Sequence, residues 1–159
     1  MKTLAVIILV LVLAVSGMLG YALFNTALVV EGKGMQTLSA QSRYEDFAEL
    51  QRNLEYGTAE ATVYGEQLLL DASEYNFYIY TLRLKNRCLV PAEMVEMQVV
   101  GKDGDILSYD DGNQVNISPG ALRDIWCVLL TRGTPTPVRE IVITYYLWGN
   151  PQTVKYTYE

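Results

Sequence analysis

The chain of 159 residues contains no histidine, only two cysteines and five prolines. Without histidine, a Ser-His-Asp triad, a Cys-His pair and the commonest side-chain ligand of transition metals are all excluded. Two carboxylates or a Ser-Lys pair can catalyse reactions without histidine, but no motif here isolates such a pair. Gly101-Lys102-Asp103-Gly104 also lacks the spacing of a phosphate-binding loop. We therefore assign no catalytic residue, cofactor or metal site, and we expect a protein that is not an enzyme.

Basic residues are few, and they do not cluster along the chain. Lys and Arg total 12 against 18 Asp and Glu, so the net charge is −6. Nucleic acids and anionic lipid headgroups bind basic surfaces. This balance argues against both as partners, and we expect no binding to nucleic acid.

A long apolar run begins the sequence. Residues Leu4 to Val30 are almost uninterrupted by polar side chains and contain no charge. As a helix, Leu4 to Phe24 would rise about 31 Å at ~1.5 Å per residue, which matches the ~30 Å hydrocarbon core of a bilayer. We predict a transmembrane anchor over residues 1–30 that contacts the lipid bilayer through residues 4–24.

A secretory signal peptide is the alternative for this run. Lys2, the apolar core Leu4–Val15 and the small residues of Val15-Ser16-Gly17 or Gly20-Tyr21-Ala22 fit a cleavable signal. A signal core usually spans ~7–15 apolar residues, and this run is longer, which favours an uncleaved anchor. Because positive charge favours the cytoplasmic side, Lys2 indicates a single-pass protein of the cell membrane with an extracytoplasmic C-terminal domain.

Residues 31–57 are expected to form a glycine linker followed by a short amphipathic helix. The two close glycines in Glu31-Gly32-Lys33-Gly34 weaken a continuing helix. From Thr37 to Tyr56 apolar residues recur at spacings of three and four, at Tyr44, Phe47, Leu50 and Leu54. Gly57 is well placed to end this helix. The apolar stripe can pack on the following domain or on the membrane surface, or it can mediate oligomerisation.

Residues 58–159 change to a period of two, which is typical of strands. The clearest strand is Asn76–Lys85, with Tyr78, Tyr80, Leu82 and Leu84 on one face. The other strand candidates are Ala59–Tyr64, Gln67–Asp71, Glu93–Val100, Ile106–Tyr109, Val115–Ile117, Ala121–Thr131, Arg139–Trp148 and Thr153–Tyr158. Turns rich in Gly, Pro, Asn and Asp separate them. We predict one mainly β domain, an immunoglobulin-like or fibronectin-like β-sandwich of roughly seven to nine strands.

One stretch resembles a known family. Leu82-Arg83-Leu84-Lys85-Asn86, followed by Leu89-Val90-Pro91, is similar to the strand–Asn–apolar–Pro stretch of desiccation-related sandwich domains of the late-embryogenesis type. The resemblance covers residues 82–91 alone. It implies a sandwich fold and carries over no function or site residue.

Four aspartates lie close together in the sequence, namely Asp103, Asp105, Asp110 and Asp111. Their carboxylates are hard oxygen ligands suited to Ca²⁺, but their spacing does not fit the EF-hand loop. Turns favour aspartate for local reasons. We therefore expect these four side chains to be solvated turn residues.

Cys88 and Cys127 are the two thiols of the chain. An oxidising compartment would allow them to form a disulfide across a sandwich. Their separation of 39 positions, from 88 to 127, is short for the usual bond between the sheets of antibody domains. We expect small buried or free thiols, with the disulfide as the alternative.

Aromatic residues concentrate on the last predicted hairpin, at Tyr145, Tyr146, Trp148, Tyr156 and Tyr158. Neighbouring residues of a strand face opposite sides, so Tyr145 and Tyr146 cannot both point inward. These side chains can fill the core, where aromatics also favour strands. Alternatively, they form an exposed strip suited to a protein interface.

The combined features predict a membrane-anchored extracytoplasmic β-sandwich that acts as a noncovalent protein-interaction or cell-envelope module. Its partner would be an envelope protein that the sequence does not identify. The alternative is a structural subunit of a pilus-like or other membrane-associated assembly, which self-associates through the N-terminal helix. An enzyme or metal-binding domain is the least favoured class.

Overall fold

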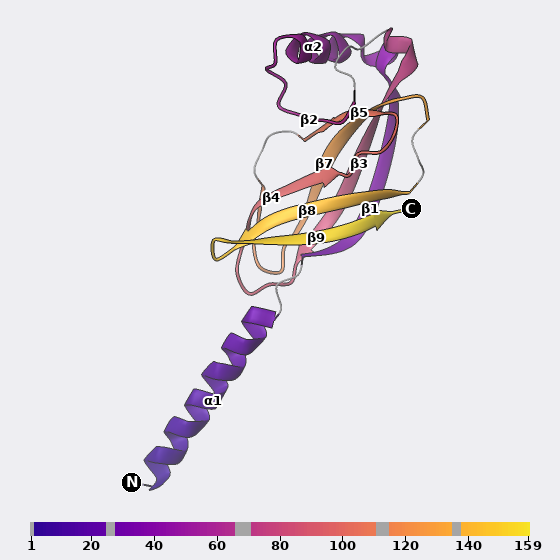
Figure 1. Ribbon diagram of the computed structural model, residues 1–159. Helices are drawn as coiled ribbons and strands as arrows, with labels where there is room; N and C mark the ends of the chain where they lie inside the picture. The colour runs from indigo at the N-terminus through magenta and orange to yellow at the C-terminus, as the bar shows by residue number, and fades with distance from the viewer. Residues whose placement is uncertain (1, 25–27, 66–70, 111–114, 135–137) are drawn as a thin grey trace.

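The computed structural model describes residues 2–24, 28–65, 71–110, 115–134 and 138–159. Within these residues the protein is mainly β, with nine strands in two antiparallel sheets behind an apolar N-terminal helix (Figure 1). The helices are α1 (Lys2–Phe24) and α2 (Tyr44–Glu55), with 3₁₀ turns η1 (Ala40–Arg43) and η2 (Ala72–Glu74). The strands are β1 (Leu28–Ser39), β2 (Thr62–Val63), β3 (Tyr75–Asn86), β4 (Ala92–Val99), β5 (Asp105–Tyr109), β6 (Val115–Ile117), β7 (Leu122–Arg132), β8 (Arg139–Leu147) and β9 (Asn150–Tyr158).

The helix α1 projects from the sandwich as a separate rod (Figure 1). Its stretch Thr3–Tyr21 is long and apolar enough to span a membrane. The side chains of residues 3–19 are all exposed, so they do not pack on the β-domain. The predicted apolar helix is therefore present. Its cleavage and its orientation across a membrane stay predictions.

The two sheets enclose the main hydrophobic core. The strand order is β1-β3-β7-β5-β2 in the first sheet and β6-β4-β8-β9 in the second. The predicted alternation of β3 is confirmed, since Tyr80, Leu82 and Leu84 are buried in one cluster with Ile141 and Ile143 of β8. Burial of such side chains, about 1.5–3 kcal/mol each, is the main force that holds the sheets face to face.

A second, smaller core lies on the outer face of the five-stranded sheet, beneath α2. Phe47 and Leu54 of α2 are buried with Phe77 of β3 and Leu130 of β7. The helix ends at Glu55, and the predicted terminator Gly57 follows two residues later with a φ of +66°, which is readily available to glycine. In Figure 1, α2 lies at the end of the sandwich opposite α1. Of the predicted amphipathic stripe, Phe47, Leu50 and Leu54 therefore pack on the sheet, whereas Tyr44 is exposed.

The prediction of a glycine linker at residues 31–34 is wrong, and so is the predicted start of the helix at Thr37. Residues Leu28–Ser39 form β1, an edge strand paired with β3 from Leu28 opposite Asn86 to Ser39 opposite Asn76. The register shifts between Val30 and Gly32, so a bulge interrupts the alternation that marks a strand. An edge strand also tolerates glycines that would weaken an isolated helix. The helix α2 begins at Tyr44, after the 3₁₀ turn η1.

Two smaller differences concern turns and short strands. The β8–β9 turn consists of Trp148 and Gly149, with φ of +51° and +75°, and the chain resumes its pairing at Asn150. Pro151 therefore lies in an edge strand, where proline is tolerated. Of the predicted strand Ala59–Tyr64, only Thr62–Val63 is paired. Residues 67–70 of the predicted strand Gln67–Asp71 lie outside the described residues.

Candidate functional site

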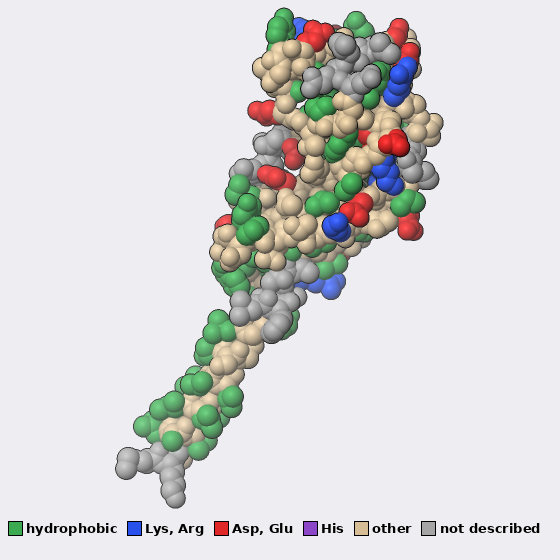
Figure 2. All heavy atoms as spheres, in the orientation of Figure 1, with side chains coloured by type: hydrophobic (Ala, Val, Ile, Leu, Met, Phe, Trp, Pro, Cys, Tyr) green, Lys and Arg blue, Asp and Glu red, His purple; other side chains and the backbone are tan. Residues whose placement is uncertain are grey.

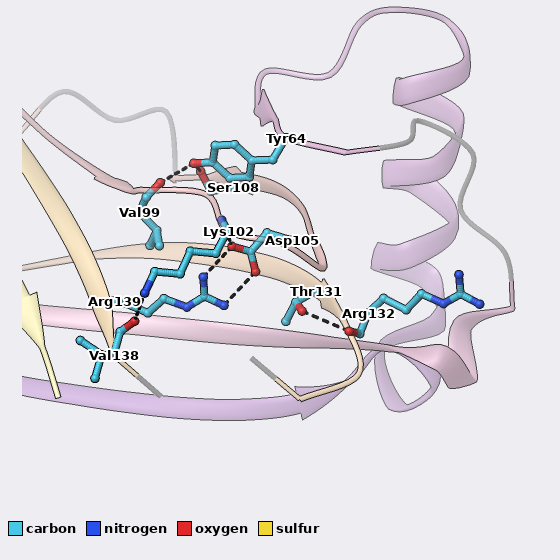
Figure 3. A network of polar contacts seen from close by, with 9 residues as sticks. All are labelled: Tyr64, Val99, Lys102, Asp105, Ser108, Thr131, Arg132, Val138 and Arg139. Atoms are coloured by element: carbon cyan, nitrogen blue, oxygen red, sulfur yellow. Dashed lines mark hydrogen bonds and ion pairs between the residues drawn. The ribbon is translucent and has the colours of Figure 1, made fainter. Parts of the chain in front are cut away.

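A buried ion pair joins the two sheets at the end distant from α1. Arg139 begins β8 of one sheet, and Asp105 begins β5 of the other. Their side chains are both 0 % exposed. Two parallel hydrogen bonds connect them, with Arg139 Nη1 2.6 Å from Asp105 Oδ2 and Nη2 2.8 Å from Oδ1 (Figure 3).

Further hydrogen bonds extend this pair into a network (Figure 3). The backbone N–H of Lys102 donates to Asp105 Oδ2 at 2.7 Å, and Lys102 Nζ donates to the carbonyl of Val138 at 2.7 Å. On the inner face of β3, burial raises the pKa of Tyr80, and the nearby Arg139 opposes that shift by its charge and a hydrogen bond. The network thus ties the β4–β5 loop and the start of β8 to the middle of the core.

The burial of Asp105 corrects our expectation of a solvated turn residue. Of the other aspartates in that group, Asp103 is exposed, Asp110 is half-buried and Asp111 lies outside the described residues. Across the described residues, no group of three or more acidic, cysteine or histidine side chains is arranged to hold a metal ion. One signal was available in the sequence, since Arg139 occupies an inward position of the apolar strand Arg139–Leu147.

The ion pair is suited to holding the sandwich together. A buried pair of charges costs several kcal/mol per ion in lost hydration, which good geometry and added hydrogen bonds must offset. Within the described part of the chain, Arg139 Nε has no hydrogen-bond partner. The pair therefore fixes the relative position of β5 and β8 at a cost, and it offers no exposed reactive group.

An apolar groove of about 280 Å³ lies on the outer face of the five-stranded sheet, beside α2. Its floor includes Trp126, which is 37 % exposed, and the half-buried Ile79 and Tyr109. The other lining residues are Leu38, Arg43, Asp46, Phe77, Thr81 and Val128. Arg43 and Asp46 form an ion pair of 2.5 Å at its edge. The groove thus combines exposed aromatic surface with a polar edge.

Two neighbouring hollows share Tyr109 with this groove. They measure about 540 Å³ and 240 Å³. Five acidic side chains line them together with Arg43, namely Asp46, Glu49, Glu60, Glu96 and Asp110. Burial raises the pKa of Tyr109, and the charge of Asp46 raises it further. The apolar groove is therefore bordered by an acidic surface, and sequence reasoning missed this site because its residues come from α2, β1, β3, β5 and β7.

The predicted aromatic strip is not assembled on one face. Tyr145 is buried, and its hydroxyl accepts a hydrogen bond of 3.3 Å from the N–H of Leu28, so its inclusion in an exposed strip was wrong. Tyr156 and Tyr158 are half-buried and pack against the main core. Tyr146 and Trp148 are exposed. The alternation of the strands divides the five aromatics between the core and the surface.

Both cysteines are free and buried, so the alternative of a disulfide is not realised. The N–H of Cys88 donates to Asn86 Oδ1 at 2.8 Å in the β3–β4 loop, whereas Cys127 lies within β7. Burial raises the pKa of the Cys127 thiol to about 12. Burial also raises the pKa of Cys88. Neither thiol is therefore poised as a nucleophile.

Ellman's reagent at pH 8 should leave both thiols of the native protein unmodified. The thiolate is the reacting form, and a pKa of about 12 leaves Cys127 almost wholly protonated at that pH. The same reagent in 6 M guanidinium should release two equivalents of product, which serves as the control. Rapid release of even one equivalent from the native protein would contradict the buried positions of Cys88 and Cys127.

No family model, curated protein or solved structure matches this chain. The resemblance of residues 82–91 to desiccation-related sandwich domains therefore stays a prediction about fold. The apolar helix and the surfaces of the sandwich are therefore the features that bear on function.

Proposed function

We propose that this protein is a single-pass membrane protein whose extracytoplasmic β-sandwich binds a partner of the cell envelope without catalysing a reaction. The observation that carries this proposal is the groove around Trp126 and Tyr109. Its lining residues belong to the five-stranded sheet and to the segment around α2. In Figure 1, α2 lies at the end of the sandwich opposite the helix that is apolar enough to span a membrane. Exposed tryptophan in a concave apolar setting is the kind of surface that dominates protein–protein binding energy.

The chemistry of this site defines the partner. The apolar groove takes a large apolar side chain, while the adjoining hollows lined by Glu49, Glu60 and Asp110 favour positive charge. Charge complementarity of this kind steers association and selects partners. We therefore infer a protein segment with one apolar anchor residue and nearby lysine or arginine.

The order of the strands supports an immunoglobulin-like sandwich. Omitting the short strands β2 and β6 leaves β1-β3-β7-β5 in one sheet and β4-β8-β9 in the other. In chain order these seven are strands A to G, so the sheets are A-B-E-D and C-F-G. That is the arrangement of constant-type immunoglobulin domains. Such domains serve many binding functions, and the fold alone assigns none of them.

A photo-crosslinking amino acid in place of Trp126 should capture the partner in intact cells. The identified segment should contain an apolar residue flanked by basic ones. Thr81→Trp, which fills the groove from β3, should reduce the adduct about tenfold, equivalent to a loss of ~1.4 kcal/mol. Thr157 is exposed on β9 and serves as the control position for the crosslinker. Equal capture from Thr157, or capture unaffected by Thr81→Trp, would refute binding in the groove.

A pilus-like or other membrane-associated assembly is the second candidate, and one observation favours it. The side chains of residues 3–19 are exposed on every side of α1, so this helix can pack against copies of itself as well as against lipid. Chemical crosslinking of the full chain after gentle detergent extraction tests it. Ladders of multimers would support assembly, and a monomer alone would favour the binding module.

A further inference from the structure

Strand register places three connections at the end of the sandwich where the chain arrives from α1. Leu28, the first residue of β1, lies opposite Asn86, the last residue of β3. The β3–β4 loop therefore lies at this end. Leu122, the first residue of β7, lies opposite Lys85. The β8–β9 turn at Trp148 also lies at this end, because Tyr146 near the end of β8 pairs with Glu93 near the start of β4. We call this the α1 end.

Each of these connections exposes a large apolar side chain. Leu89 of the β3–β4 loop is 47 % exposed, Leu122 is 51 % exposed and Trp148 is 53 % exposed. Tyr146 and Met94 are also exposed. Tyr146 lies two residues before Trp148, and Met94 follows Glu93, the residue with which Tyr146 pairs. Figure 2 shows hydrophobic side chains gathered on the part of the sandwich next to α1. Two loops and the start of β7, which meet at one end, thus each expose a large apolar side chain.

Trp148 occupies a turn position that favours other residue types. Trp148 has φ of +51° at the first position of a two-residue turn, and Gly149 follows with φ of +75°. Such turns favour asparagine or glycine, because a bulky side chain is strained in the left-handed region. Residues held in such sparsely populated backbone regions cluster at functional sites.

The chain itself holds this end close to the end of α1. The four residue steps from Phe24 to Leu28 can cover at most about 14 Å. Arg87 and Arg123 border the exposed apolar residues, and Glu31 and Glu93 lie at the same end. The charges are thus mixed, and the distinguishing property of this surface is its aromatic and aliphatic side chains. Tryptophan concentrates at the interface between lipid headgroups and hydrocarbon, because its ring is apolar and its N–H can donate a hydrogen bond.

We propose that Leu89, Leu122 and Trp148 form a bilayer-contact surface that enters the interfacial layer of the membrane in which α1 is anchored. This inference rests on the proposed membrane anchoring. Contact at three places fixes the tilt of the sandwich, as interfacial tryptophan does for transmembrane helices. The groove at Trp126 is then held in a constant orientation toward its partner.

Fluorescence quenching by brominated lipid tests this surface in the full chain. Trp126→Phe leaves Trp148 as the sole tryptophan, and Trp148→Phe leaves Trp126 as a matched control on the outer face of the sheet. Both variants are reconstituted into phosphatidylcholine vesicles with or without bromine on the acyl chains. We expect bromine to remove most of the Trp148 emission and to leave the Trp126 emission unchanged. Equal quenching of the two, or none for Trp148, would overturn the proposal.

Vesicle flotation separates this proposal from the anchoring on which it depends. Protein that floats with the vesicles but shows an unquenched Trp148 would refute the contact surface alone. Protein that does not float would refute the anchor and the surface together. Trp148→Asn should raise the melting temperature, because asparagine suits the turn. A lower melting temperature would mean that Trp148 is kept for the stability of the hairpin, which also contradicts the proposal.

Discussion

Replacing Arg139 with methionine should lower the free energy of unfolding by about 3–5 kcal/mol, because the carboxylate of Asp105 is then left buried without its partner. Both side chains are inaccessible, and two short hydrogen bonds connect them. A domain of this size has a total stability of roughly 5–15 kcal/mol, so the variant should approach the limit of folding. Urea denaturation followed by tyrosine and tryptophan fluorescence measures the change.

The exposed ion pair of Arg83 and Asp124 provides the matched control. It is also bidentate, with distances of 2.7 and 2.8 Å, but both side chains are about half exposed. Arg83→Met should therefore lower the free energy of unfolding far less than Arg139→Met does, because solvent screens the exposed pair. The double variant Arg139→Met with Asp105→Leu should recover much of the lost stability, because it removes the orphaned charge. A loss for Arg139→Met no larger than that for Arg83→Met would refute the role of the buried pair.

Replacing Asn86 with alanine should destabilise the protein by about 3 kcal/mol, because buried groups lose their hydrogen-bond partners. Asn86 is fully buried, and its Nδ2 donates to the carbonyls of Val90 and Ile117, each at 2.8 Å. Its Oδ1 accepts from the N–H of Cys88 at 2.8 Å. The side chain thus organises two connections at the α1 end. Hydrogen exchange should show faster opening of residues 87–91, together with a lower urea midpoint.

Asn116 offers a comparison at the same end of the sandwich. Its Oδ1 accepts one hydrogen bond of 2.9 Å from the N–H of Met94, and the residue is exposed. Asn116→Ala should cost about 1 kcal/mol or less, because water can replace the lost partner. Similar losses of stability for the two variants would contradict this prediction, because the hydrogen bonds of Asn86 would then contribute no more than those of an exposed asparagine.

Elements with a strong local pattern agree with the structure. The alternation of Tyr80, Leu82 and Leu84 predicted β3 because a strand within a sandwich buries one face. The failure at β1 has a local cause, since a bulge after Val30 and two glycines remove the alternation. The candidate groove was not predictable because β6, the turn after it and the first residues of β7 separate Tyr109 from Trp126 in the sequence, and neither β5 nor β7 alone defines a concave surface.

The sequence by itself determined the apolar helix, the β character of the domain and the opposed faces of Tyr145 and Tyr146, because each depends on residues within one helix or strand. Only the tertiary structure decided which aromatics enter the core and that Asp105 meets Arg139. These two charges lie 34 positions apart and in different sheets. Their contact depends on how the sheets pack, and the turn-like sequence around Asp105 does not indicate that packing. The apolar residues at Leu89, Leu122 and Trp148 likewise become one surface only when strand register brings them to the same end.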